Sequence, residues 1–326
     1  MLGRTMALAF ILWSFAVLTL AAEPTLLHVN AFRSARSLPF YAAIDRGFFA
    51  KHGLNVVLQF TEGSESQRAG LADGSVDIAQ SAVDNAVAMI DVAKADVVIV
   101  SGGDSGTNEF YVQGDIRDFA GIRGHAIAVD ASNTAYALQA KKILLQHGLK
   151  GGTDYTLNAV GNGTHRLHAL LTDKHNAGAI LNLPFSLQAA AQGLHSLGRT
   201  TDLLGPYQAD GAFVRRAWAR DHAEALVNYL AAYIEALRWS LDPKNHAEAV
   251  AMLVDKLKLP QDMAEQSLKL IAEPGFGFAR DAKFDMAGFK NVLAMRAETE
   301  GGTPADPQRY IDLSYYDRAM KLVNKE

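Results

Sequence analysis

The stretch LPFYAAIDRGFFAKHGLNVVLQF, residues 38–60, contains the unit from which the first part of the chain is built. Residues 38–46 have the composition of a helix that ends at Gly47, and residues 56–60 form the apolar run of a strand. The same alternation of apolar run, polar or glycine-containing loop and helix extends from Leu26 to Val112. It predicts an α/β domain with a largely parallel sheet, in which ligands bind outside the carboxyl ends of the strands.

A second run of the same pattern follows a break at Gly114-Asp115. Apolar runs at 126–129, 155–160 and 177–181 each precede a polar loop and a helix-like stretch. Beyond Arg215 the pattern becomes helical. We expect helices over 218–240, 243–258, 260–272, 286–298 and 315–323, packed on the first domain.

Length and composition are those of a globular protein with two domains. The chain has 326 residues, of which 49% are hydrophobic and 20% charged, which argues against disorder and coiled coil. Without residues 1–21 it would carry 30 basic and 35 acidic residues, a formal charge of −5, since Arg4 is the charged residue removed. This balance argues against nucleic acid or an anionic membrane as the main partner.

The amino terminus has the features of an export signal. Arg4 precedes the uncharged residues 5–20, and small residues then favour cleavage after Ala21 or Ala22. The alternative is a retained membrane anchor, because residues 5–22 are 18 uncharged residues. With no cysteine, the chain has no thiol nucleophile, thiolate metal site or lipid-anchoring Cys. We expect a periplasmic protein that, lacking any heptad run, is monomeric.

Three segments carry a resemblance to a known family. Residues 38–56 are similar to the opening helix and second strand of the substrate-binding proteins of nitrate, sulfonate, taurine and thiamine-pyrimidine-precursor ABC importers. LADGSVDIA (71–79) resembles the family's turn into the third strand, and IRGHAIAV (122–129) its second-lobe opening. The resemblance implies a type 2 periplasmic-binding-protein fold: after the signal peptide 1–21, lobe 1 comprises 25–112 plus 211–326 and lobe 2 comprises 113–210. Two crossovers, near 113–115 and 208–211, would form the hinge.

The loops after the predicted strands supply the candidate ligand residues. Several begin helices, whose free N–H groups suit an anion, and Arg33 is the best candidate partner for a carboxylate or sulfonate. Plain helix capping is the competing explanation for the short polar residues, and carboxylates at the same loop ends (Glu65, Asp84, Asp104 and Asp130) could instead bind a ligand amine. Phe32, Phe40, Tyr41, Tyr136 and Phe185 could stack on a flat ligand, or pack in the core. The full set of candidates is Arg33, Ser37, Tyr41, Ser64, Glu65, Ser81, Asp84, Asn108, Ser132, Asn133, Thr134, Asn162, Thr164 and Asn182, with Arg36 as a second choice for the cation.

Three short motifs suggest enzymes but lack the context that each enzyme class needs. Gly103-Asp104-Ser105-Gly106 imitates a serine-protease loop without that class's all-β barrel. His165 and His168 have no carboxylate to complete a metal site, and Gly275-Phe276-Gly277 has no preceding strand.

The resulting hypothesis is an exported solute-binding protein of an ABC importer that captures a small organic anion, namely a sulfonate, a carboxylate or a heteroaromatic compound, by hinge closure and then docks on a membrane permease. No cofactor and no metal are expected. Two alternatives stay open: an enzyme resembling the pyrimidine-precursor synthases of the same fold, which look like intracellular, cysteine-dependent proteins, and a ligand-sensing module for a membrane partner.

Overall fold

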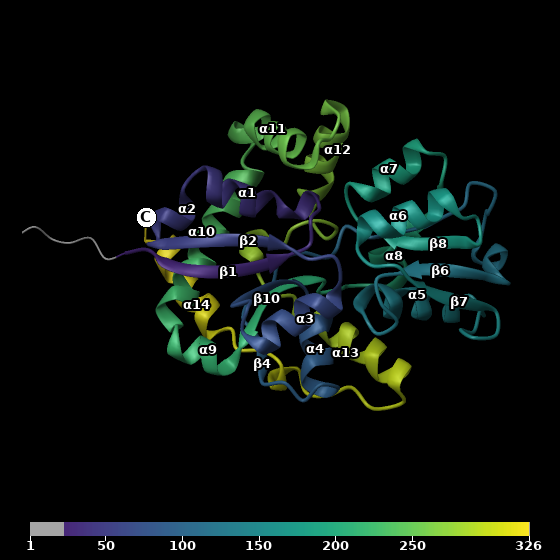
Figure 1. Cartoon of the computed structure of the whole chain (residues 1–326), viewed down its shortest axis with the longest axis horizontal. Coiled ribbons are helices and arrows are strands. Elements are labelled where there is room, and N and C mark those ends of the chain that lie inside the picture. Colours follow the sequence, from purple (N-terminus) through teal and green to yellow (C-terminus); the bar gives the residue numbers. More distant parts are fainter. Residues whose placement is uncertain (1–22, 326) are drawn as a thin grey trace, which may run out of the picture.

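The computed structural model describes residues 23–325, and it forms two α/β lobes side by side (Figure 1). The expected signal peptide, residues 1–21, lies outside the described residues. Within 23–325, no helix is long and apolar enough to cross a membrane.

The first lobe is built on a five-stranded mixed sheet with the order β2-β1-β3-β10-β4. Its strands are β1 (Thr25–Ala31), β2 (Leu54–Phe60), β3 (Ile78–Ala82), β4 (Val97–Ile99) and β10 (Asp210–Arg215). The first three are parallel, with Val29 opposite Leu58 and Ile78, whereas β10 runs antiparallel between β3 and β4. The helices of this part are α1 (Leu38–Asp45), α2 (Phe48–Lys51), α3 (Ser64–Asp73) and α4 (Asp84–Asp91), with a short 3-10 turn, η1 (Ala35–Ser37), before α1.

The second lobe repeats this arrangement with the strand order β7-β6-β8-β5-β9. Its strands are β5 (Glu109–Val112), β6 (His125–Val129), β7 (Tyr155–Ala159), β8 (Asn176–Leu181) and β9 (His195–Arg199). The antiparallel strand in the fourth position is β5, which pairs with both β8 and β9. The helices are α5 (Ala135–Gln146), α6 (Gly163–Thr172), α7 (Phe185–Ala191) and α8 (Thr200–Leu204).

The first lobe boundary differs from the expected one. Residues 109–112 were expected in lobe 1, but as β5 they belong to the sheet of lobe 2. The first crossover is therefore the segment 100–108, not 113–115, while the second, 205–209, lies close to the expected 208–211. The sequence was ambiguous because β4 and β5 are both short buried apolar runs, and such a run does not indicate which sheet it joins.

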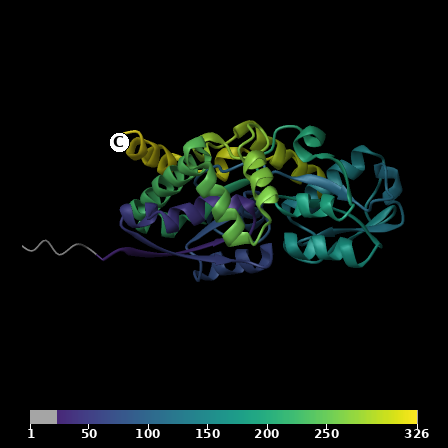
Figure 2. The same ribbon diagram turned by 90° about the horizontal axis from the view of Figure 1, so that it is seen from above.

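The C-terminal part is helical, as expected, and packs on the first lobe. Figure 2 shows these green and yellow helices over the purple strands and helices of the first lobe. Ring contacts position the long helix α10 (Ala223–Leu241) on the first lobe. The ring centres of Tyr233 and Phe40 are 5.1 Å apart, and Tyr229 stacks on Phe49 with ring centres 5.7 Å apart. The helices are α9 (Arg216–Asp221), α10 (Ala223–Leu241), α11 (His246–Leu257), α12 (Gln261–Ile271), α13 (Met286–Glu300) and α14 (Ser314–Val323).

The two crossovers lie against each other. The backbone N–H groups of Ala209 and Asp210 donate to the Asp104 carbonyl at 3.0 and 3.3 Å. The loop at Phe276 and Gly277 supports the first crossover by accepting from the N–H groups of Thr107 and Ser105, each at 3.1 Å. Glycine is required at Gly211, because an added Cβ would lie 2.4 Å from the Ser101 carbonyl oxygen of the other crossover.

Candidate functional site

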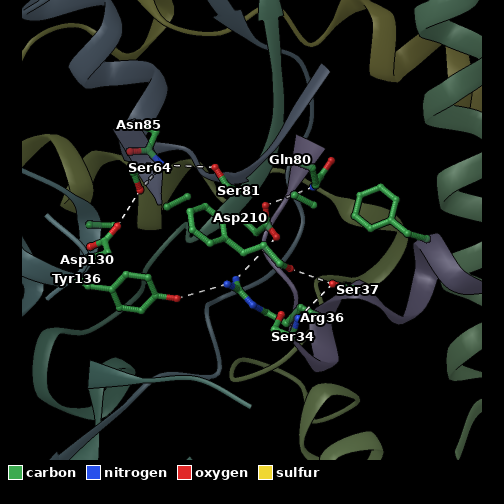
Figure 3. A pocket seen from close by; sticks show the side chains of 15 residues that line it. Ser34, Arg36, Ser37, Ser64, Gln80, Ser81, Asn85, Asp130, Tyr136 and Asp210 are labelled. Carbon is green, nitrogen blue, oxygen red and sulfur yellow. Dashed lines mark hydrogen bonds and ion pairs between the residues drawn. The ribbon is translucent and has the colours of Figure 1, made fainter. Parts of the chain in front are cut away.

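A small enclosed cavity lies between the lobes at the carboxyl ends of β1, β3 and β6, where the sequence predicts a ligand site. Its volume of about 30 Å³ holds no more than about two water molecules. Figure 3 shows its polar lining, which consists of Ser34, Arg36, Ser37, Ser64, Gln80, Ser81, Asn85, Asp130, Tyr136 and Asp210. Phe32 and Phe40 add an apolar wall.

Arg36 joins the cavity to the hinge. Its Nη1 donates to both carboxylate oxygens of Asp104, at 3.0 and 3.1 Å, and lies 3.7 Å from Asp210 Oδ2. Asp104 belongs to the first crossover and Asp210 begins β10 directly after the second. These three residues, called here the hinge cluster, are almost entirely buried.

One guanidinium between two buried carboxylates shifts all three pKa values. Burial would lower the pKa of Arg36, but the charges around it, chiefly that of Asp104, outweigh burial and raise that pKa. At Asp104 burial dominates and raises the pKa despite the ion pair. Burial, followed by the charge of Asp104, raises the pKa of Asp210 to about 7. Asp210 therefore keeps its proton over part of the pH range in which ordinary carboxyls are ionised.

Around Ser64 a second network crosses from the first lobe to the second. Its hydroxyl donates to Asp130 Oδ2 at 2.7 Å and accepts from the Asn85 amide at 3.3 Å (Figure 3). Thr134 donates its hydroxyl proton to the other oxygen of Asp130. Since Ser64 begins α3 and Asp130 follows β6, this network forms only when the lobes are together.

The lobes also touch outside the cavity. Asn162 donates its amide to Glu62 Oε2 at 2.7 Å, and the Ala35 backbone N–H donates to the Leu183 carbonyl at 3.0 Å. From α13, Arg296 donates to Asn133 Oδ1 at 2.9 Å. The structure is thus a closed form, in which contacts across the cleft surround the small cavity.

Three of the predicted ligand residues, Ser37, Ser64 and Ser81, line the cavity. Thr134 adjoins it through its bond to Asp130. These residues lie at the strand ends, where the sequence predicts that the loops converge. Whether any of them contacts a ligand stays a prediction.

Arg33, the predicted anion partner, does not line the cavity. Its side chain is exposed, and the guanidinium carbon lies 4.6 Å from the centre of the Phe60 ring. The turn η1 explains the difference, because it directs Arg36, three residues later, to the hinge cluster. The first-choice cation is therefore absent from the cavity lining, whereas Arg36, the second choice, belongs to it.

The remaining candidates lie outside the cavity lining. Asp84 is paired with Arg296, with Oδ2 2.6 Å from Nη2 and Oδ1 2.8 Å from Nε. Asn162 caps α6 by accepting from the His165 N–H at 3.2 Å, which is the competing explanation for such residues. Glu65, Ser132 and Thr164 are exposed, Asn133 binds Arg296, and Tyr41, Asn108 and Asn182 are buried elsewhere.

Four polar lining residues were not among the predicted ligand residues: Ser34, Gln80, Asn85 and Asp210. Ser34 and Asn85 lie inside loops expected at the cleft, 32–38 and 81–85, but were not chosen within them, and Gln80 directly precedes the second loop. Asp210 had no such signal, because it begins the antiparallel strand β10 and does not follow a parallel strand.

The enzyme-like motifs have structural explanations. Asp104 of the Gly-Asp-Ser-Gly segment belongs to the hinge cluster, and the loop at Gly275-Phe276-Gly277 supports the first crossover. His165 and His168 are exposed on α6, and among residues 23–325 no group of three or more His, Cys, Asp or Glu residues could hold a metal ion.

The architecture is the periplasmic-binding-protein fold, as predicted. The periplasmic nitrate-binding protein NrtA from Synechocystis PCC 6803 is similar over 93% of this chain and 90% of its own, with a TM-score of 0.77 and 16% identity. The ligand-binding component of an ABC-type import system from Staphylococcus aureus, with zinc bound, gives a TM-score of 0.73 at 12% identity, covering 90% of this chain and 99% of its own. The alkanesulfonate-binding protein SsuA from Xanthomonas axonopodis pv. citri, bound to MOPS, gives 0.67 at 15% identity, covering 86% and 93%.

The family follows from the sequence itself. The model of the NMT1-like family matches residues 20–254, more than half of the chain, and the chain belongs to the NMT1-like family. No curated protein is similar enough in sequence to match it.

Proposed function

We propose that this chain is the solute-binding component of an ABC importer and captures a small molecule in the cavity between its lobes. One observation carries the proposal: polar groups from both lobes line a closed cavity, and the two crossovers next to it can act as a hinge. The names of the structural relatives, which include ligand-binding components of import systems, point the same way. The proposal also includes that the protein is exported and monomeric, and that it docks on a permease.

Capture would work by a shift between open and closed forms. In the open form Ser64 and Asp130 separate, and solute enters from the cleft. A solute that contacts both walls adds binding free energy only to the closed form, so it shifts the population toward closure. In the closed form described here, the cavity of about 30 Å³ has room only for a very small solute. Binding of a larger solute therefore leaves the lobes slightly further apart than they are in this structure.

Small-angle scattering and native mass spectrometry of the purified protein test the proposal together. We expect mass spectrometry to detect a small molecule that is released on denaturation. We expect scattering to show that the radius of gyration decreases when this molecule is added back to stripped protein. Turnover of the released molecule would favour the enzyme alternative, whereas absence of any bound or added solute would contradict solute capture. Genes for a permease and an ATPase beside this one would separate transport from sensing.

A further inference from the structure

Three of the four serine hydroxyls that line the cavity, those of Ser37, Ser64 and Ser81, have already used their protons. Ser37 donates to the Phe32 carbonyl at 2.9 Å, Ser64 to Asp130 at 2.7 Å and Ser81 to Gln67 Oε1 at 2.5 Å. A hydroxyl has a single proton to donate. While these bonds hold, none of the three serines donates to a solute.

The orientation of the Asn85 amide follows from this network. The Gln67 amide donates to Asn30 O and Oδ1, at 3.1 and 2.9 Å, so Gln67 Oε1 must accept from Ser81. With their protons used, Ser64 and Ser81 can only accept from the Asn85 Nδ2, at 3.3 and 3.4 Å. The other amide atom, Asn85 Oδ1, is buried and has no hydrogen-bond partner within residues 23–325. Buried acceptors in folded proteins are paired with a hydrogen-bond donor.

The charges in the cavity also favour a solute group that donates hydrogen bonds. The guanidinium of Arg36 is held by the two carboxylates of the hinge cluster. Asp130, in contrast, accepts from the neutral hydroxyls of Ser64 and Thr134. Asn85 and Asp130 both contact Ser64, so an acceptor and a carboxylate lie on either side of one residue (Figure 3).

We infer that the cavity binds a small solute through an amino or ammonium group that donates to Asn85 Oδ1 and Asp130, and that this solute carries a net charge of zero or above. The inference rests on the proposed function, since it takes the cavity as the solute site. Figure 3 also shows Arg36, whose buried Nε has no acceptor within residues 23–325. The solute therefore also presents an acceptor to Arg36 Nε. An anion without N–H groups, such as nitrate or a plain alkanesulfonate, leaves Asn85 Oδ1 without a donor and meets the charge of Asp130.

Matched pairs of probes test the amino group on the unaltered protein. Stripped protein is titrated calorimetrically with taurine against ethanesulfonate, with 4-aminopyrimidine against 4-methylpyrimidine, and with sodium nitrate, and the molecule released from freshly purified protein is identified. We expect binding only by an amino member of a pair, or release of a molecule with an amino group. If the members of a pair bind equally, if nitrate binds, or if the released molecule lacks N–H groups, the inference fails while solute capture stands. If no probe binds and nothing is released, solute capture fails as well.

Asp130→Asn locates the contact. This change removes the charge and keeps an acceptor for Ser64, and it should weaken binding of the amino probe, or of the released amine, at least tenfold. Glu65→Gln is the matched control, because Glu65 follows Ser64 in the chain but is exposed, and it should bind within twofold of the wild type. Circular dichroism and the melting temperature check that both variants fold. Equal binding by D130N and the wild type would overturn the contact, and if D130N does not fold, the matched pairs on the unaltered protein decide.

Discussion

The two lobes share one strand order but contribute very differently to the cavity. Of the 15 lining residues only Asp130, Ala135 and Tyr136 come from lobe 2. Lobe 1 together with the crossovers supplies the hinge cluster and the Ser64, Ser81 and Asn85 network, whose bonds to one another lie within that part. Ser64 also donates to Asp130 of lobe 2. The comparison teaches that one lobe carries a largely preformed site, and that the other completes it with a carboxylate and an aromatic ring.

Removing the cation of the hinge cluster should have the largest effect on stability. Arg36→Met leaves Asp104 and Asp210 buried without their guanidinium, and breaking a buried ion pair in this way costs about 3–5 kcal/mol. Urea unfolding monitored by circular dichroism measures the loss. Arg33→Met is the control, because Arg33 is exposed. Equal stability of R36M and the wild type would show that the preformed character of lobe 1 does not depend on this cluster.

The pH dependence of stability should reveal the proton that Asp210 retains in the folded protein. The pKa of Asp210, about 7 in the folded protein against 3.8 ordinarily, means that the folded state binds more protons than the unfolded state between these values. This contribution to stability is therefore present at low pH and is lost as the pH rises through about 4 to 7. Melting temperatures of Asp210→Asn and the wild type across this range measure it as a difference. The D210N curve should decline less than that of the wild type, because only Asp104 then contributes, and parallel curves would contradict the assignment.

A smaller effect is expected where the lobes meet. Ser64→Ala removes the hydrogen bond to Asp130 across the cleft, which costs about 1 kcal/mol. Because the bond forms only in the closed form, the unliganded protein should populate open forms more, and scattering should give a larger radius of gyration. Ser66→Ala, whose hydroxyl bonds only to Gly63 and Thr61 of the same lobe, should leave the radius unchanged. The same increase in both variants would mean that Ser64 does not hold the lobes together.

The smallest effect is expected at Arg33. Arg33→Ala removes an exposed cation that stacks on Phe60, so stability should change by less than about 0.5 kcal/mol. Solute affinity, measured by calorimetry with the molecule identified above, should stay within twofold. A tenfold loss of affinity would restore the anion prediction that first singled out this residue.

Much of the fold could be predicted because its signals are local. Pro243 and Pro260 indicated where helices begin. The apolar spacing from Trp218 to Ser240 predicted one helix, which the structure divides at His222 into α9 and α10. The sheet of β5 could not be predicted, since a buried apolar run fits either lobe. In the site, sequence found the right loops but not the right members, because the turn η1 decides between Arg33 and Arg36. The direction of the hydrogen bonds at Ser64 and Ser81 was likewise unpredictable, as it is set by Gln67 and Asp130, which are distant in the chain.

The position of β10 has a consequence for the order of folding. Lobe 2 is formed by one continuous segment, from β5 to β9, and it can acquire its structure as soon as that segment is available. In lobe 1, β4 is joined to β3 only through β10, whose residues follow the whole of lobe 2. Contacts that are so distant in sequence form late, because a long loop must close before they contribute. The lobe that carries the preformed site is thus the last to be completed, and we expect a folding chain to pass through a stage with a structured second lobe and an unfinished first one.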